Sequence, residues 1–534
     1  MKTRSHSVVP LFAFVLLLAF GAGGASAHPQ FADRAQAKDI ASLTWAVPAT
    51  IRGLDYTHSA DAVTASVISL GMETLVQYDR LGRLRPNLAS SFSTPNATTY
   101  VYVLRKGVKF WDGHPLTTAD VVYSLQQSAS KAAGSNIASF FSDVTSMAAT
   151  GPRTVTIKLK GANPFFRYSI AVTPIGEKAF WSAHLKDLGT PGVLNMGTGP
   201  FKFTKFVPDD SVTMTRNNAY WGRKAAAKKI TLKFIVDAAT RQLAVRSHQV
   251  DGTFQVPQEQ IDQYKKLSGV KVQVAPELRT AYISLDVATP PFNDVHVRRA
   301  LAYALDKAGL VKAVLRGYGQ PAPTMPPPEQ WGDLMSQKKV KALYKSLPQY
   351  AFSMAKAKAE LAKSAFPNGF TATAPYPDSR QELGKALLSL AQNVKTIGIT
   401  LNVKQVTTDE WFNTLYTHPT PLGMQTISWG VDYPDPADAL ALIYPSAYAT
   451  ANAFNTSNYK SAAMDALIDK QNASVSPAVR AKAISSALKL AATDVPYIPV
   501  WYQQIAMALN SKYQFKSFGT WYLYSPWARD ITPA

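Results

Sequence analysis

The sequence predicts a mixed α/β protein of two or three lobes, and three observations lead to this class. The chain has 534 residues, and a single domain usually holds about 100–200. Segments with strand-like alternation and segments with helical spacing follow one another, which is typical of helices that cover mixed sheets. Hydrophobic residues make up 46% of the chain and aromatic residues 11%, a composition that excludes a disordered protein.

The N-terminus has the pattern of a secretory signal peptide, which we expect to span residues 1–27. Lys2 and Arg4 precede an apolar run over residues 8–20, and the segment ends in A-S-A at 25–27, an A-x-A-like cleavage site. The alternative is an uncleaved membrane anchor, but the run is short for a span of about 20 residues. We therefore expect a soluble mature chain that starts near His28. Its expected location is the periplasm, and because the chain has no cysteine, no lipid anchor or disulfide is expected.

The first half of the mature chain is rich in strand patterns. Alternating or β-branched runs predict strands at 43–47, 99–104, 155–159, 201–207, 212–215 and 230–235. Helices are predicted at 62–70 and over the apolar residues between 239 and 245. A further helix should begin after Thr117 or Thr118, which can cap it, with Asp120 in its first turn.

The second half alternates helix and strand. Apolar spacing predicts one amphipathic helix from Val297 to Leu315, closed by Gly317. Further elements are predicted as helices at 355–365, 383–397 and 478–492 and a strand at 399–406. The proline cluster at 321–328 is predicted to be a surface loop.

Motif searches favour a binding protein over an enzyme. The chain lacks H-E-x-x-H, G-x-S-x-G and Walker A motifs, and neither a cofactor nor a metal is expected. Asp432, Asp435 and Asp438 recur at intervals of three, but this spacing does not match a calcium loop. A secreted hydrolase with a site assembled from distant residues stays open as an alternative.

The net charge of +21 is strongly basic, which makes an adhesin or nucleic-acid binder a further alternative. The lysines and arginines are dispersed and no nucleic-acid motif accompanies them. A solvated cationic surface is therefore favoured, and no nucleic-acid partner is expected.

An ordered set of motifs resembles the extracellular solute-binding proteins of the oligopeptide/dipeptide/nickel class, family 5, which serve ABC importers. The most specific motif is LRKGVKFWDGHPLTTADVVYSL at 104–125. Further matches, in the order of the family, are ETLV at 73–76, GTGPF at 197–201, RNNAYWG at 216–222, VRRAL at 297–301 and WGVDY at 429–433. One departure is Asp286, where many relatives carry asparagine.

The resemblance implies a two-lobed periplasmic-binding-protein fold of type II, in the large three-subdomain class, with mixed β-sheets and hinge strands. Lobe I would comprise 28–72, 195–275 and 497–534, with an inserted subdomain at 73–194, and lobe II would be 276–496. The hinges would lie near Ala275 and Pro496. Ligand binding would favour the closed arrangement through contacts with both lobes.

The resemblance also implies the ligand site. In peptide-binding members an aspartate in a W-x-x-D-Y stretch pairs with the α-amino group of the ligand, and Asp432 stands at that position. Such pairing is physically sound, because a buried ammonium needs a partner. The alternative is that Asp432 only organises a turn before Pro434. The other ligand-binding candidates are Trp429, Gly430, Tyr433, Trp411, Tyr56, His58, Phe254 and Gln255.

The function implied is capture of a peptide, or a similar small solute, for membrane permease subunits of an ABC importer, by a monomer without catalytic activity. A metal chelate, a sugar or an opine stays open as the ligand, since specificity depends on the site rather than on the fold.

Overall fold

The computed structural model describes residues 38–534, which form one compact unit. The expected signal peptide and the start near His28 lie outside these residues and stay predictions. The main strands are β1 (Leu43–Val47), β4 (Ala89–Asn96), β5 (Thr99–Leu104), β6 (Val144–Gly151), β7 (Thr154–Leu159), β8 (Phe201–Val207), β9 (Ser211–Arg216), β10 (Lys229–Phe234), β11 (Gly252–Thr253), β12 (Val270–Leu285), β13 (Gly319–Pro321), β14 (Thr371–Pro377), β15 (Thr400–Val406), β16 (Met424–Gly430) and β17 (Tyr497–Asn510).

Helices alternate with these strands, as the sequence predicts. The longer ones are α1 (Ala62–Ile68), α2 (Thr118–Ala129), α5 (Ala238–Arg246), α7 (Val295–Ala304), α8 (Lys307–Ala313), α9 (Gln337–Ser346), α10 (Met354–Leu361), α11 (Gln381–Lys395), α12 (Thr408–Thr417), α13 (Ala437–Ile443), α14 (Ala462–Asn472) and α15 (Pro477–Asp494). Two short helices, α3 (Phe166–Ala171) and α4 (Lys178–Ala183), lie in the predicted subdomain.

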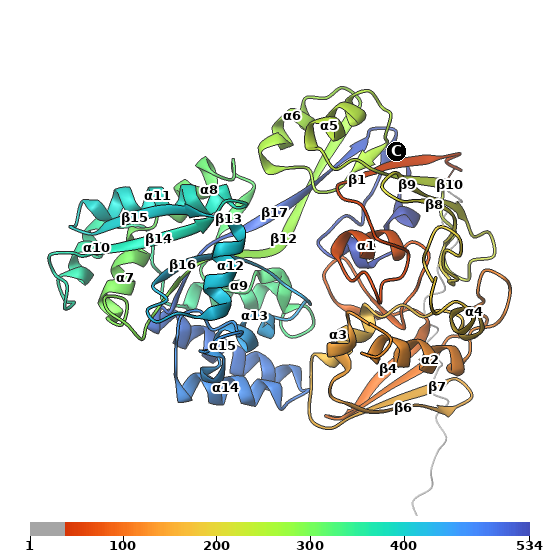
Figure 1. The fold of residues 1–534 in the computed structure, drawn as a ribbon, viewed down its shortest axis with the longest axis horizontal. Helices are drawn as coiled ribbons and strands as arrows, with labels where there is room; N and C mark the ends of the chain where they lie inside the picture. The colour runs from red at the N-terminus through yellow and green to blue at the C-terminus, as the bar shows by residue number, and fades with distance from the viewer. Residues whose placement is uncertain (1–37) are drawn as a thin grey trace, which may run out of the picture. The chain divides into compact units, whose positions relative to one another are not determined.

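The largest sheet contains strands from both predicted lobes. Its order is β16-β12-β17-β11-β1-β10-β9-β8, with β13 beside β17. The long antiparallel strands β12 and β17 connect the group around β1 with the group around β16 (Figure 1). Their register shifts between Pro276 and Thr280, close to the predicted hinge at Ala275, although the lobe boundaries themselves stay predictions.

The predicted subdomain contains a sheet of its own, in the order β4-β5-β7-β6. Helix α2 packs against β6 and β7 (Figure 1). The predicted cap is confirmed at Thr117, whose hydroxyl accepts a hydrogen bond from Asp120 N, while the Asp120 carboxylate accepts from Thr117 N. This reciprocal capping box fixes where α2 begins.

The hairpin of the 104–125 motif is held against a glycine turn. Trp111 Nε1 donates to Gly199 O at 3.2 Å, and Trp111 N donates to Gly197 O. A Cβ atom at Gly197 or Gly199 would lie 2.3 or 2.5 Å from Gly71 O. The backbones therefore approach more closely than any other residue would allow.

Two predictions about the second half are wrong. The single helix expected from 297 to 315 is broken into α7 and α8, because the Asp306 side chain accepts from Gly309 N and starts a new helix. The proline cluster is not a surface loop, since most of residues 322–327 are buried. Its carbonyls accept hydrogen bonds from hydroxyls of Thr280, Tyr344 and Tyr502, which satisfies the backbone in the interior.

Candidate functional site

The candidate site is built where β16 ends and α13 begins. Among the described strands, β16 lies at the edge of the large sheet and pairs with β12, with Trp429 opposite Thr280 and Gly430 opposite Arg279. Residues 431–436 then turn into α13, whose N-cap is Pro436. Asp432 and Tyr433 therefore lie in the short connection between β16 and α13.

Asp432 lies on an exposed part of this connection. Its backbone N–H donates to Asp438 Oδ2 at 3.3 Å, and the surrounding protein raises the pKa of its carboxyl by desolvation. The Asp432 charge in turn contributes to raising the pKa of Tyr56 and of Tyr524, after burial itself. These two phenols come from distant parts of the chain, and one of them, Tyr56, was predicted.

The neighbours of Asp432 supply aromatic surfaces. Tyr433 stacks on Tyr168 with ring centroids 5.3 Å apart and planes 7° apart, and it also packs on Phe165. Trp429 is half-buried and meets Phe454 edge to face at 5.4 Å. Tyr433 thus joins the predicted lobe II to the predicted subdomain.

Gly430 is half-buried beside the Arg279 guanidinium. A Cβ atom at this position would lie 3.0 Å from Arg279 Nη2. Its strand edge opposite β12 is unpaired within the sheet order, which leaves backbone groups that an extended ligand could pair with.

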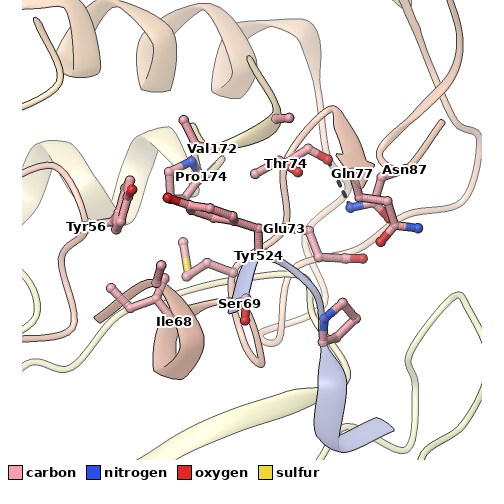
Figure 2. A pocket seen from close by; sticks show the side chains of 14 residues that line it. Tyr56, Ile68, Ser69, Glu73, Thr74, Gln77, Asn87, Val172, Pro174 and Tyr524 are labelled. Atoms are coloured by element: carbon pink, nitrogen blue, oxygen red, sulfur yellow. Dashed lines mark hydrogen bonds between the residues drawn. The ribbon is translucent and has the colours of Figure 1, made fainter. Parts of the chain in front are cut away.

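A pocket opens beside Tyr56 and Tyr524. It has about 420 Å³ of empty space, part of it open to solvent, and its walls include Ile68, Met72 and Val172. Figure 2 shows Tyr524 extending across this pocket toward Tyr56, with Glu73 on the other side. The Glu73 carboxyl accepts hydrogen bonds from Thr198, Tyr220 and Trp221, and burial raises its pKa.

Three predicted residues are occupied with structural contacts or lie apart from the pocket. Trp411 is 9% exposed and donates its indole N–H to Thr426 O, within a buried apolar cluster. Phe254 is 4% exposed among Trp45, Tyr522 and other aromatic rings. Gln255 is exposed, with a left-handed backbone at φ 53°.

His58 is tied to its own surroundings through both ring nitrogens. Nδ1 lies 2.5 Å from Asp55 Oδ2, and Nε2 lies 2.7 Å from Ala133 O. The hydrogen bond with Asp55 is the main cause that raises the pKa of His58 to about 9. The pair fastens the early loop to residues 130–136, where Asn136 also contacts this loop.

Sequence reasoning missed Tyr524 and the burial of Asp438. Tyr524 lies near the C-terminus, far in sequence from the predicted site, and no motif marks it. Asp438 was noted only as part of a spacing pattern, although its position six residues after Asp432 was visible. Burial, which decides its chemistry, could not be predicted from that spacing.

The departure at Asp286 has a structural explanation. Asp286 is fully buried, and its carboxylate accepts hydrogen bonds from Leu422 N, Thr289 Oγ1 and Asn458 Nδ2. These bonds organise the loops behind β12 and β16. None of the contacts involves the connection that carries Asp432.

One His/carboxylate cluster lies elsewhere. His114 Nδ1 is 2.8 Å from both Asp112 Oδ2 and Glu177 Oε1, and the His114 side chain is 72% exposed. The three groups satisfy one another as a surface ion-pair network. We assign no metal to them.

Comparison with known structures defines the class of fold. HbpA2 from Haemophilus parasuis has a TM-score of 0.80 and is 24% identical, with 92% of this chain and all of that chain covered. DppA from Helicobacter pylori in complex with the peptide STSA has a TM-score of 0.68 at 23% identity, covering 92% and 98%. The fold is that of type II periplasmic binding proteins, as the sequence predicts.

The family follows from the sequence itself. Residues 83–451 match the model of bacterial extracellular solute-binding proteins, family 5. The glutathione-binding protein GsiB of Escherichia coli K12 is 24% identical over 479 residues, which cover 88% of this chain and 90% of GsiB. The chain belongs to family 5 of the bacterial extracellular solute-binding proteins, the solute-binding components of ABC importers.

The matched relatives are binding proteins. Within residues 38–534, no helix combines the length and the apolar character that crossing a bilayer requires.

Proposed function

We propose that this protein captures a peptide, or a similar small solute with a free amino group, and that Asp432 binds the ligand's ammonium. The observation that carries this proposal is the placement of Asp432, an exposed carboxylate at the end of edge strand β16, beside Tyr433, which stacks on Tyr168 from another part of the chain. Desolvation raises the pKa of the Asp432 carboxyl, and among the described residues no Lys, Arg or His lies within ion-pair distance of it. A ligand ammonium would supply a cationic partner.

The other contacts follow from the same geometry. The half-buried Trp429 and the ring of Tyr433 would pack against the ligand, and backbone groups near Gly430 would pair with its peptide bond. Tyr56 and Tyr524 would line a pocket for an apolar group next to the ammonium. We do not assign ligand contacts to His58, whose two ring nitrogens are both engaged, or to Trp411 and Phe254, whose side chains are buried.

The remaining parts of the proposal concern the protein's setting. The lobes would be those the sequence predicts, and closure about β12 and β17 would bury the ligand. The protein would be a periplasmic monomer with a cleaved signal peptide, which delivers its ligand unchanged to permease subunits. The Helicobacter pylori relative DppA, which holds the peptide STSA in its complex, supports a peptide as the ligand.

The test is calorimetry on the Asp432→Asn variant. Removing the charge leaves the ligand ammonium without a partner, so we expect binding to weaken by about 2–5 kcal/mol. Asp409→Asn on the exposed start of α12 makes the same charge change away from the site and should leave affinity unaltered. Equal affinities for wild type and Asp432→Asn would contradict the proposal.

Mass spectrometry of material released from the denatured protein identifies the ligand class. A released peptide supports the proposal. A metal chelate, sugar or opine would show instead that the same fold binds a non-peptide solute. Cleavage of a bound peptide during prolonged incubation would support the alternative that the protein is a secreted hydrolase.

A further inference from the structure

Two buried aspartates follow Asp432, and they differ in whether a cationic side chain pairs with them. Asp435 is fully buried and receives two hydrogen bonds from Arg480, at 2.7 and 2.8 Å. Asp438 is also fully buried, but no Lys, Arg or His of the described residues lies within ion-pair distance of it. Within residues 38–534, one aspartate therefore has a counter-ion and the other has none.

The hydrogen bonds of Asp438 are also incomplete. Its Oδ2 accepts only two long bonds, from Trp429 Nε1 at 3.4 Å and from Asp432 N at 3.3 Å. Its Oδ1 is buried without any partner among residues 38–534. An ionised carboxylate in this position would be costly, because a buried charge needs a counter-charge or several donors.

Both donors that reach Asp438 come from proposed ligand-binding residues. Trp429 offers its side chain and Asp432 its backbone. Asp438 therefore lies next to the proposed ammonium site, where the positive charge of a ligand would lower the pKa of its carboxyl. Two acidic groups so placed ionise in sequence rather than together, because like charges disfavour one another.

We propose that Asp438 is the second acidic group of the ammonium site: it holds a proton while the site is empty and releases it when a ligand cation binds beside Asp432. This inference rests on the proposed function of Asp432. In the step, the O–H bond of Asp438 breaks, its proton passes to solvent, and the ligand ammonium keeps all of its own protons. The ligand cation then faces two negative charges instead of one.

Other ionisable groups around the site do not compete for this role. Burial raises the pKa of Tyr433 and Tyr168, and likewise of Tyr56 and Tyr524 beside Asp432, so these phenols stay neutral. The charge of Asp435 is matched by Arg480, and Arg167 donates to Tyr168, whose hydroxyl in turn donates to Asp435. Burial, followed by repulsion from Asp432, raises the pKa of Asp438 well above its ordinary range.

The arrangement has a consequence for ligand choice. Proton release adds negative charge only where a cation is present to stabilise it, so compact cationic groups such as a primary ammonium are favoured over neutral groups. Affinity should therefore rise with pH until Asp438 is ionised in the empty protein as well. Asp438 acts as a positioning residue through Trp429 and Asp432, and it also sets the charge of the site.

The first experiment needs no ligand. The raised pKa of Asp438 means that the folded state keeps a proton which the unfolded state loses above about pH 4. Wild type should therefore lose stability relative to Asp438→Asn as pH rises from there, and the gap between their urea midpoints should widen and then level off. Parallel midpoints at every pH would overturn the proposed proton.

The second experiment measures protons released on binding, by calorimetry of glutathione and of trialanine in buffers with small and large heats of ionisation. Wild type should release up to one proton per ligand within the pH range where its stability gap widens. In the same pH range Asp438→Asn should release fewer protons than wild type, and its affinity should depend less on pH, because only Asp432 still titrates. Proton release by Asp438→Asn equal to that of wild type would overturn the inference.

The two proposals fail in different ways. If Asp432→Asn binds as well as wild type, or neither probe binds wild type, the proposed function is contradicted, and the ligand-free midpoints still decide whether Asp438 carries a proton. If Asp432→Asn abolishes binding while wild type releases no proton, the proposed function is supported, and the inference that Asp438 releases a proton on ligand binding is contradicted.

Discussion

At the scale of single residues, the segment from 432 to 438 contains three aspartates whose properties differ because their burial and their charged partners differ. Asp432 is exposed, Asp435 is paired with Arg480, and Asp438 is buried with no cation among the described residues at ion-pair distance. The spacing of these residues was visible in the sequence. Their surroundings were not, because Arg480 and Tyr524 come from segments with no sequence link to the motif.

The Asp435–Arg480 pair gives a stability prediction. Arg480→Met should lower the free energy of unfolding by about 3–5 kcal/mol, because it leaves a buried carboxylate without its counter-ion. Urea unfolding followed by tryptophan fluorescence measures this. Lys363→Met is the matched control, since the Lys363 side chain that pairs with Glu360 is exposed and its loss should cost about 0–1 kcal/mol. A similar small loss for both variants would show that the buried pair does not stabilise the fold.

At the scale of elements, the patterns that were predicted correctly are those that depend on local chemistry. Strand β1 was predicted with its observed bounds, and the Thr117 cap with its Asp120 partner. The break between α7 and α8 was missed because apolar spacing continues through Asp306, whose capping bond competes locally with the helix. The proline loop was misjudged because two of its hydroxyl donors come from the distant strands β12 and β17, and the third comes from the following helix α9.

The glycine turn behind the hairpin of the 104–125 motif gives a prediction at this scale. Gly199→Ala should destabilise the protein by about 1–3 kcal/mol, because the new Cβ would lie 2.5 Å from the backbone oxygen of Gly71. Gly161→Ala is the control, since no atom lies within 4 Å of the place that its new Cβ would take. Thermal unfolding of both variants provides the comparison. Equal midpoints would mean that the backbone of the turn moves at no cost.

At the scale of the whole molecule, the long strands β12 and β17 explain how distant segments reach one site. β12 pairs with β16, which leads to Asp432, while β17 pairs with β11 and continues toward the segment that carries Tyr524. The fold class and family could be predicted because ordered motifs cover most of the chain. The composition of the pocket could not, since its walls come from residues 56–87, 171–174 and 524–526.

The central claim is that a ligand is held by its free amino group at Asp432. The most direct test offers the wild-type protein an equimolar pool of short peptides, half with free and half with acetylated amino termini, and identifies the retained peptides by mass spectrometry. If Asp432 binds the amino group, free-amine peptides should be retained almost exclusively, because acetylation removes the positive charge that the carboxylate would bind. Equal retention of acetylated peptides would contradict it.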